Sequence, residues 1–312
     1  MILHTVRRGD TLRGIACRYR LPPGTLREAN PQLVCATQLR PGTVLMVPLP
    51  QKPCGSAAVC FCPNADAPAF DSAALAPTWA SVFTCSVSAG GELRPVGLAA
   101  PEQFQGCGRL LTVKNLSEAG SFSGSAAHPV LTDAEIQAAF LQNLLAFLDR
   151  NVLSGVVLEF AYVFPFDRDP FQRFLPRLSE RLHERGYLLF SVLPPQSGPE
   201  QFSLGGTACF CADHGNAADF VIVKSVDDSP AALRDVLSHA VSEIPHGKIL
   251  ADLSDFSLSL PLRAEDVRRK ECALRLAAEF GLAGFCCREP GCLLPPFSTI
   301  LTGLYRVEQA HT

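Results

Sequence analysis

Short apolar runs alternate with amphipathic segments along most of this chain, a pattern typical of strand-helix repeats. The runs predict strands at residues 57–62, 80–85, 109–114, 155–162, 187–193, 219–224, 248–253 and 282–287. Between them, apolar residues recur at helical spacing, which predicts helices most clearly at 132–150, 168–185, 229–243 and 264–280. Eight strands that alternate with helices predict a closed parallel (β/α)8 TIM barrel.

The first part of the chain follows a different pattern. An apolar start at 2–6 precedes a turn at 8–11, helical stretches from Leu12 and Thr25, and a closing strand at 44–48. This order predicts a small β-α-α-β domain at residues 1–48. The stretch 49–56 is rich in proline and small residues, which predicts a linker. We expect the barrel to span residues 57–312.

Composition and charge narrow the choice of partners. The chain of 312 residues is 47% apolar and 18% charged, which favours two compact domains over disorder. Residues 1–48 hold seven arginines against Asp10 and Glu28, so this segment is basic while the remainder is acidic. Because Tyr19 is its only stacking aromatic and finger-type Cys/His spacing is missing, we expect an acidic wall polymer as partner rather than nucleic acid.

The N-terminus and the apolar runs also bear on location. No long apolar stretch follows the first positive charges, and no run approaches the roughly 18 apolar residues of a membrane span. We therefore expect a protein that is made in the cytoplasm without a signal peptide and has no membrane span.

The N-terminal segments HTVRRGDTLRGIACRY, LREANPQL and LRPGTVLMVP resemble a LysM module over its whole length. The resemblance implies a chitin or peptidoglycan glycan, bound between the loop after the first strand and the loop after the second helix. By position, the implied groove residues are Gly9, Asp10, Thr11 and Leu12, then Asn30, Pro31 and Leu33. A structural interpretation is compatible with this one: Asp10 or Thr11 caps the first helix and Asn30 makes a turn.

The segments LLTVKNLSEAGSFSGSAAHPVL, SGVVLEFAYVFPFDRDPFQRFLPRLSERLHERGYLLFSVLPP and GLAGFCCREPG resemble glycoside hydrolase family 18, in particular its spore-cortex-lytic N-acetylglucosaminidases. In that family the fourth strand carries Asp-Gly-x-x-x-Asp-x-Glu, and the glutamate protonates the glycosidic oxygen while the substrate acetamido group attacks. The corresponding positions here are Ser154, Gly155, Glu159 and Ala161. By this resemblance the acid position is occupied by Ala161. We expect no cofactor.

Glu159 is the remaining candidate for catalysis on this strand. Two strand residues span roughly 6.6 Å, whereas an acid must lie within about 3 Å of the oxygen that it protonates. A shifted substrate is needed for Glu159 to act as the acid. The alternative is an interior polar residue, paired with Lys224 or Arg288 so that no unpaired charge is buried.

Other positions of the resemblance concern the cleft. The family tyrosine after the sixth strand is missing from Lys224-Ser225-Val226-Asp227, and Arg288 stands where the family has a tryptophan under the sugar. Asn115 and Tyr162 match the family pattern, so we expect the barrel cleft to include Asn115, Tyr162, Asp227 and Arg288. Turn formation and core packing are the alternative roles of Asn115 and Tyr162.

The 13 cysteines allow two further hypotheses. Cys60, Cys62, Cys85 and Cys286 lie on strands that are neighbours in a closed barrel, which raises the possibility of a metal site. Since CxxC spacing is missing, we favour buried cysteines that act as small apolar residues and expect no metal. The second hypothesis is oxidative crosslinking in an extracellular layer through exposed Cys17, Cys35, Cys54, Cys107 or Cys292.

The function that these patterns favour is glycan binding. We expect the LysM-like module to bind GlcNAc-containing peptidoglycan and the barrel to have lost catalysis, in the spore cortex or coat of a spore-forming bacterium. An active N-acetylglucosaminidase or chitinase-like hydrolase of cortex peptidoglycan is the first alternative. A coat protein crosslinked through cysteine to other spore envelope proteins is the second.

Overall fold

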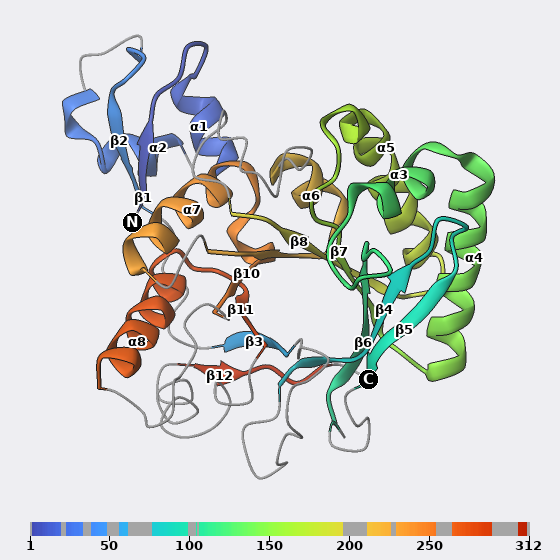
Figure 1. Cartoon of the computed structure of the whole chain (residues 1–312). Coiled ribbons are helices and arrows are strands. Elements are labelled where there is room, and N and C mark those ends of the chain that lie inside the picture. The colour runs from blue at the N-terminus through green and yellow to red at the C-terminus, as the bar shows by residue number, and fades with distance from the viewer. Residues whose placement is uncertain are drawn as a thin grey trace.

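The computed structural model of this chain describes residues 2–19, 23–33, 39–48, 56–61, 77–98, 104, 106–195, 211–225, 229–253, 264–288 and 305–310. Within these ranges a small two-stranded sheet with helices precedes a larger sheet that closes into a barrel (Figure 1). Most of the expected linker, 49–55, lies outside the described residues.

The N-terminal unit is the expected β-α-α-β arrangement. Its antiparallel strands are β1 (Ile2–Thr5) and β2 (Val44–Val47), and its helical segments are α1 (Leu12–Arg18), α2 (Pro23–Glu28) and η1 (Pro31–Leu33). Along β2 buried and exposed residues alternate, because successive strand side chains point to opposite faces. A small core of Val6, Ile15, Tyr19, Leu26 and Leu45 holds the unit together.

Eight parallel strands form the barrel, and each expected strand is confirmed. They are β3 (Ser56–Phe61), β4 (Trp79–Val87), β6 (Gly108–Lys114), β7 (Gly155–Glu159), β8 (Leu188–Leu193), β9 (Phe220–Val223), β10 (Ile249–Asp252) and β11 (Gly284–Cys287). The sheet runs in this order and closes where β11 and β4 both pair with β3. β7 ends at Glu159 rather than at 162, because the backbone of Ala161 bonds to the Asn115 side chain instead of a strand.

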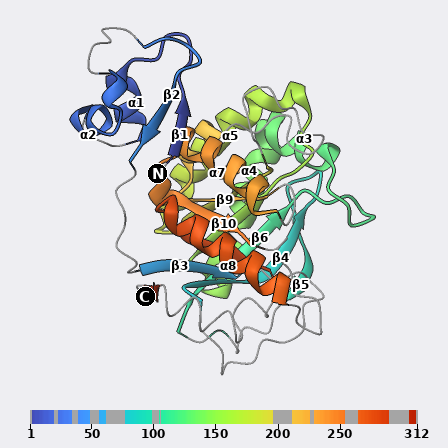
Figure 2. The ribbon, with the colours of Figure 1, turned by 90° about the vertical axis from the view of Figure 1, so that its left-hand side faces the viewer.

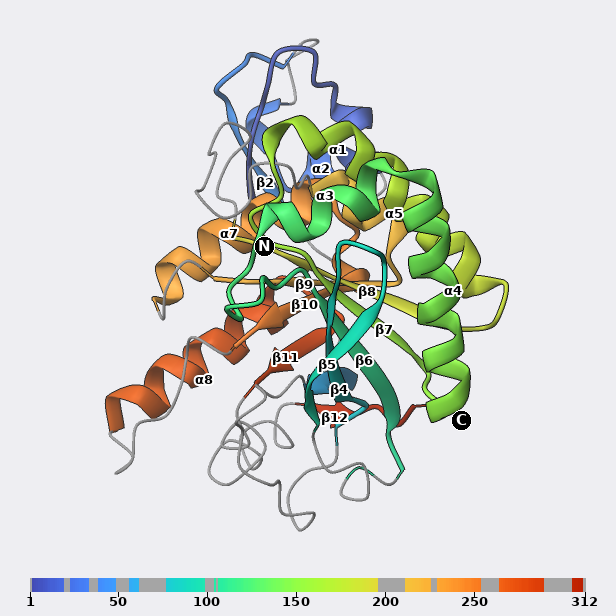
Figure 3. The same cartoon turned by 45° about the vertical axis from the view of Figure 1, so that its right-hand side comes forward.

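Two strands were not expected from the sequence pattern. β5 (Leu93–Leu98) returns antiparallel to β4 as a hairpin on the outside of the barrel, and its turn is bound to a helix by the Asn143 amide, 3.0 Å from the Gly91 carbonyl (Figure 3). β12 (Arg306–Val307) pairs with the beginning of β3. The Pro and Gly in LRPVGL hide β5 from a periodicity analysis, since both residues are rare in strands.

Helices cover the exterior of the barrel along the strands from β6 to β11 (Figures 1 and 2). The four expected helices are confirmed as α4 (Ala134–Asn151), α5 (Arg168–His183), α7 (Pro230–Glu243) and α8 (Ala264–Glu279). Two more helices, α3 (Gly124–Thr132) and α6 (Cys211–Ala217), were missed. α3 contains Pro129 and begins at a glycine, and α6 is a single short segment, so neither presents a long apolar stripe.

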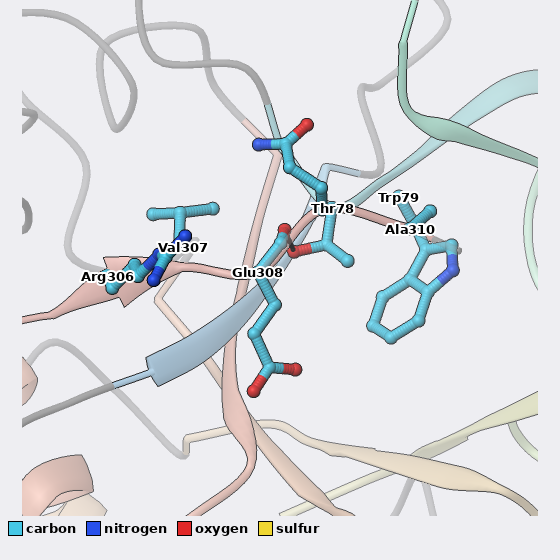
Figure 4. Close-up of a pocket in the computed structure, with 7 residues that line it drawn as sticks. Thr78, Trp79, Arg306, Val307, Glu308 and Ala310 are labelled. Carbon is cyan, nitrogen blue, oxygen red and sulfur yellow. Dashed lines mark hydrogen bonds between the residues drawn. The ribbon is translucent and has the colours of Figure 1, made fainter. Parts of the chain in front are cut away.

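Aromatic side chains fill the N-terminal end of the barrel. The ring of Trp79 lies 5.2 Å from that of Phe190 and 4.9 Å from that of Phe220. Thr78 donates a hydrogen bond to the Glu308 carbonyl at 2.6 Å, which fastens the C-terminal segment beneath this end (Figure 4). A cavity of about 520 Å³ between Trp79 and residues 306–310 therefore lies at the end of the barrel opposite to Glu159.

The small domain rests on the outside of the barrel. β1 contacts α7, and the Arg7 guanidinium lies 3.6 Å from the Glu243 carboxylate (Figure 2). His239 lies on the same helix and is partly buried, and this burial lowers the pKa of its imidazole.

Candidate functional site

The C-terminal end of the barrel carries a cluster of charged side chains around Glu159. Glu159 is the last residue of β7, and it pairs in register with Lys114, the last residue of β6. Asp252 ends β10, and Lys224 and Arg288 directly follow β9 and β11. Because chemistry in such barrels takes place at this end of the strands, the cluster occupies the place of an active site.

Glu159 is held by three cations. Its carboxylate lies 2.6 Å from Nζ of Lys224, 2.9 Å from a terminal nitrogen of Arg288 and 3.5 Å from Nζ of Lys114. Arg288 also lies 3.5 Å from the Asp252 carboxylate. The expected pairing of Glu159 with Lys224 or Arg288 is confirmed with both, and Lys114 is a third partner that the sequence analysis missed.

The surroundings of Glu159 decide its protonation state. Its side chain is only 3% exposed, and burial by itself raises the pKa of the carboxyl. The charges of Arg288, Lys224 and Lys114 outweigh that effect and bring the pKa of Glu159 well below its ordinary value. At neutral pH the group is therefore an ionised carboxylate with no proton to donate.

Ala161 lies just beyond β7, and its position is set by Asn115. The fully buried Asn115 amide accepts a hydrogen bond from the Ala161 N–H at 2.9 Å and donates one to the Ala161 carbonyl at 2.7 Å. The same amide lies 2.9 Å from the Ser123 carbonyl. Asn115 thus joins the loops that follow β6 and β7 and fixes the backbone at Ala161.

Tyr162 has an unusual backbone conformation at the barrel mouth. Its φ is +53°, in the left-handed region that is costly for a residue with a Cβ, and its side chain is 53% exposed. Gly124, the first residue of α3, is close enough that an added Cβ would meet the Tyr162 carbonyl at 2.6 Å. Close packing of α3 against the Tyr162 backbone therefore stabilises this strained conformation, and the Tyr162 side chain stays exposed to solvent.

Further aromatic rings lie along the same loop. Phe164 stacks on Phe166 with a centroid distance of 5.0 Å, and Phe166 is exposed. His128 of α3 meets the Phe166 ring edge-on and holds the buried Asp167 carboxylate at 2.7 Å. This exposed aromatic loop was not identified from the sequence, although the spacing of Tyr162, Phe164 and Phe166 is visible there.

In the small domain, Asp10 organises the loop after β1. Its carboxylate accepts hydrogen bonds from the Arg7 backbone N–H at 2.8 Å and from Nε2 of His4 at 3.1 Å. Burial raises the pKa of Asp10, but these hydrogen bonds outweigh it and leave the pKa lowered. Because Nε2 donates to a carboxylate, Nδ1 of His4 accepts from the Tyr19 hydroxyl, 2.9 Å away.

Two other residues of this loop, Gly9 and Thr11, are exposed to solvent. Thr11 Oγ1 accepts from the Gly14 N–H at 3.0 Å, which confirms that Thr11 caps α1. Gly9 is exposed and has a φ of +93°, a conformation that favours glycine. Leu12 is partly buried against the domain core. Gly9 and Thr11 are thus open to solvent, whereas the Asp10 carboxylate is engaged inside the loop.

The loop after α2 is anchored by Asn30, which is fully buried. Its amide donates to the Leu26 and Met46 carbonyls at 2.7 and 2.6 Å and accepts from the Met46 N–H at 2.7 Å. Leu33 is buried, and Pro31 is exposed. The Asn30 side chain therefore ties α2 to β2, and only Pro31 of these three predicted residues is open to solvent.

The cysteines do not gather as the metal hypothesis requires. Cys60 and Cys286 are register partners inside the barrel, but Cys85 belongs to the core between the barrel and its helices, so its predicted proximity is wrong. Within the described ranges, no group of three or more His, Cys, Asp or Glu side chains is placed to hold a metal ion. Cys62, like Cys35, Cys54 and Cys292, lies outside the described residues.

Two further predictions concern individual residues, and a third concerns membrane-spanning helices. Cys107 was expected to be exposed but is partly buried, and burial raises the pKa of its thiol to about 11. Cys272 is exposed. Asp227, predicted for the cleft, lies outside the described residues together with Val226. None of the helices in the described part of the chain has the length and apolar character that a membrane crossing requires.

Comparison with known proteins agrees with this architecture. Residues 4–48 match the LysM domain family. Relatives include the cortical fragment-lytic enzyme of Bacillus anthracis, 29% identical over 167 residues that make up 49% of this chain and 38% of the relative. A proposed sporulation-specific glycosylase of Bacillus subtilis, YdhD, is 27% identical over 273 residues, or 80% of this chain and 63% of that protein. The chain thus spans less than two thirds of these relatives.

Solved structures share the fold. The spore cortex-lytic enzyme SleL of Bacillus megaterium is 17% identical with a TM-score of 0.69, covering 99% of this chain and 87% of that one. A chitinase of Chromobacterium violaceum is 20% identical with a TM-score of 0.68, covering 80% of this chain and 98% of that one. The chain therefore carries a LysM domain followed by a TIM barrel similar in fold to spore cortex-lytic enzymes and chitinases.

Proposed function

We propose that this chain is a peptidoglycan-binding protein of the spore envelope whose barrel no longer hydrolyses glycans. The LysM domain attaches the protein to GlcNAc-containing glycan, and the barrel is a glycan-recognising or structural body. The Bacillus relatives named as a cortical fragment-lytic enzyme and a sporulation-specific glycosylase support the spore cortex as the location. We place the LysM domain at 1–48, the linker at 49–56 and the barrel at 57–312.

The main support for a loss of catalysis is that Glu159 is ionised and held in ion pairs. Ala161 has no proton to give, and the carboxylate two residues earlier is ionised and bound by Lys224, Arg288 and Lys114. A general acid contributes about 10² to 10⁴ in rate, so a barrel without one is a poor hydrolase. A carboxylate engaged by three cations is also poorly placed to support an acetamido group during its attack.

Glycan attachment rests on the LysM match and on the loops at 9–12 and 30–33. Thr11 and Pro31 are exposed there, while Asp10 and Asn30 fix the loops from inside. We assign the predicted groove to Gly9, Asp10, Thr11, Leu12, Asn30, Pro31 and Leu33. In this assignment Asn30 and Leu33 shape the groove and the exposed residues contact the glycan.

Co-sedimentation of the full chain with purified cortex peptidoglycan tests this function. Thr11→Asp retains a side chain that caps α1 and adds a negative charge at the groove. We expect it to weaken binding several-fold, because peptidoglycan is itself anionic. Val44→Asp adds the same charge on the exposed face of β2, away from the helices, and serves as the matched control. Equal binding by wild type and Thr11→Asp would contradict the proposed groove.

A further inference from the structure

Among the residues that the structure describes, five charged side chains meet at the mouth of the barrel. Three cations, Lys114, Lys224 and Arg288, face two carboxylates, Glu159 and Asp252. All five belong to strand ends or to the residues that directly follow them. The backbone of the barrel therefore fixes where their Cα atoms lie, and Lys114, Lys224 and Arg288 are held by the fold rather than carried by a surface segment.

The two lysines retain capacity to bind an anion. In the part of the chain that the structure describes, Glu159 is the only ionic partner of Lys114 and of Lys224. Lys114 lies 3.5 Å from that carboxylate, the outer limit for a hydrogen bond, and an ammonium group has three donors. The side chains of Lys114 and Lys224 are 16% and 29% exposed, so water or a ligand reaches both.

The position of Glu159 between the lysines keeps them together. Without a carboxylate between them, two ammonium groups so close would repel each other. Glu159 bonds to Lys224 through Oε1 and lies nearest to Lys114 through Oε2, so one buried anion positions both cations at the mouth. A second carboxylate that enters from solvent meets two donors already in place, in a partly desolvated site where such contacts are stronger than in water.

We infer that the barrel mouth binds a carboxylate-bearing fragment of the cell wall through Lys114 and Lys224. This inference rests on the proposed wall-binding function and adds the chemical class that the barrel recognises. N-acetylmuramic acid and the stem peptides of peptidoglycan both carry carboxylates, whereas N-acetylglucosamine is neutral. The site therefore discriminates by charge between fragments with a free carboxylate, on a stem peptide or on unsubstituted N-acetylmuramic acid, and neutral N-acetylglucosamine.

Isothermal titration of the full chain tests the inference. The probes are N-acetylmuramic acid, N-acetylglucosamine, which lacks the lactyl ether and its carboxylate, and D-alanyl-D-alanine as a peptide carboxylate. We expect wild type to bind at least one carboxylate probe about tenfold more tightly than N-acetylglucosamine, with an affinity that falls as salt is raised. The carboxylate probe with the higher affinity identifies sugar or peptide as the source.

Variants of the lysines locate the binding. Lys114→Met and Lys224→Met are each expected to remove this preference, while Lys114→Arg retains it because the charge stays in place. Arg185→Met removes an exposed cation at the other end of the barrel and is the matched control. A thermal melt of each variant verifies its fold, and Lys114→Arg tests the charge even if the methionine variants unfold.

Two outcomes separate this inference from the proposed function. If the carboxylate probes bind no better than N-acetylglucosamine, or if Lys114→Met, Lys224→Met and wild type bind them equally, the inference is wrong even though the chain still sediments with peptidoglycan. If sedimentation itself fails while the carboxylate preference persists, the LysM attachment is wrong and the barrel site stands. The result we expect is a carboxylate preference that depends on Lys114 and Lys224 but not on Arg185.

Discussion

The ammonium group of Lys224 lies 2.6 Å from Oε1 of Glu159, inside the end of the barrel where a glycosidase would hold its substrate. Glu159 is the last residue of β7, at the end of the barrel where chemistry takes place in such folds. In this chain the carboxylate is the centre of an ion cluster with Arg288 and Lys114. The cluster explains how a buried carboxylate is accommodated in the interior of the barrel.

Replacing Glu159 by Gln should destabilise the fold. Removing one partner of a buried ion pair typically costs about 3–5 kcal/mol; since the lysines are partly solvated, we expect roughly 2–3 kcal/mol less free energy of unfolding. Glu271→Gln breaks an exposed pair with Arg275 and should cost less than about 0.5 kcal/mol. Urea denaturation at pH 7 measures both. Similar small effects for the two variants would mean that Glu159 does not support the fold.

Acidification should weaken the fold through His214. Burial lowers the pKa of His214 to about 3, so the imidazole stays neutral in the folded chain but titrates near 6.5 when unfolded. The unfolded state then binds more protons below pH 6.5, and stability falls as the pH falls from 6.5 toward 3. His4 and His239 have lowered pKa values as well and act in the same direction.

The contribution of His214 is isolated by His214→Gln, which retains a polar group near the Ser191 hydroxyl, 2.6 Å from the imidazole in the wild type. We expect the loss of stability between pH 7 and pH 5, followed by urea midpoints, to be smaller in the variant. An unchanged pH dependence would show that His214 is accessible to protons in the folded state.

Two residues with left-handed backbone offer a test of stored strain. Val152, 73% exposed after α4, has a φ of +51°, and Tyr162 has a φ of +53°. Glycine relieves about 1 kcal/mol at such positions, so both Val152→Gly and Tyr162→Gly should raise the unfolding free energy. Only Tyr162→Gly should also weaken binding of chitooligosaccharides. If both variants bind equally well, the strain at Tyr162 has no role in recognition.

Restoring a glutamate at position 161 should not restore hydrolysis. Asn115 holds the backbone at this position, so Ala161→Glu is expected to fold with a melting temperature close to that of wild type. The neighbouring Glu159 would still be bound by Lys224, Arg288 and Lys114, and it would be unable to assist the substrate acetamido group. Release of reducing ends from chitooligosaccharides by this variant would show that Ala161 alone accounts for the loss.

The eight strands of the barrel could be predicted from the sequence, whereas the hairpin strand β5 and the helix α3 could not. Apolar runs such as GVVLE are buried on both faces and stand out from their helical neighbours, so all eight strands were found. The hairpin strand β5 and the helix α3 were missed because Pro95, Gly97 and Pro129 interrupt their patterns. Their formation depends on contacts with α4, α5 and the loop of Tyr162, which are tertiary.

Prediction of the site depended on strand alternation. Residues that end a strand on its inward face are recognisable, which is why the pairing of Glu159 with Lys224 or Arg288 was predicted. Lys114 and Asp252 carry the same signal, a charge at the end of an apolar run, but the sequence analysis did not use it. The positive φ of Tyr162 and the bond between Asn115 and Ala161 arise from loop geometry that no local pattern encodes.

The most direct test of the central claim is incubation of the pure protein with cortex peptidoglycan, followed by measurement of bound protein and of newly formed reducing ends. We predict that the wild-type chain sediments with the polymer and releases no reducing ends above the buffer control. Release by the wild type that Glu159→Gln abolishes, in a variant that still sediments with the polymer, would contradict the account and make Glu159 part of a working hydrolase.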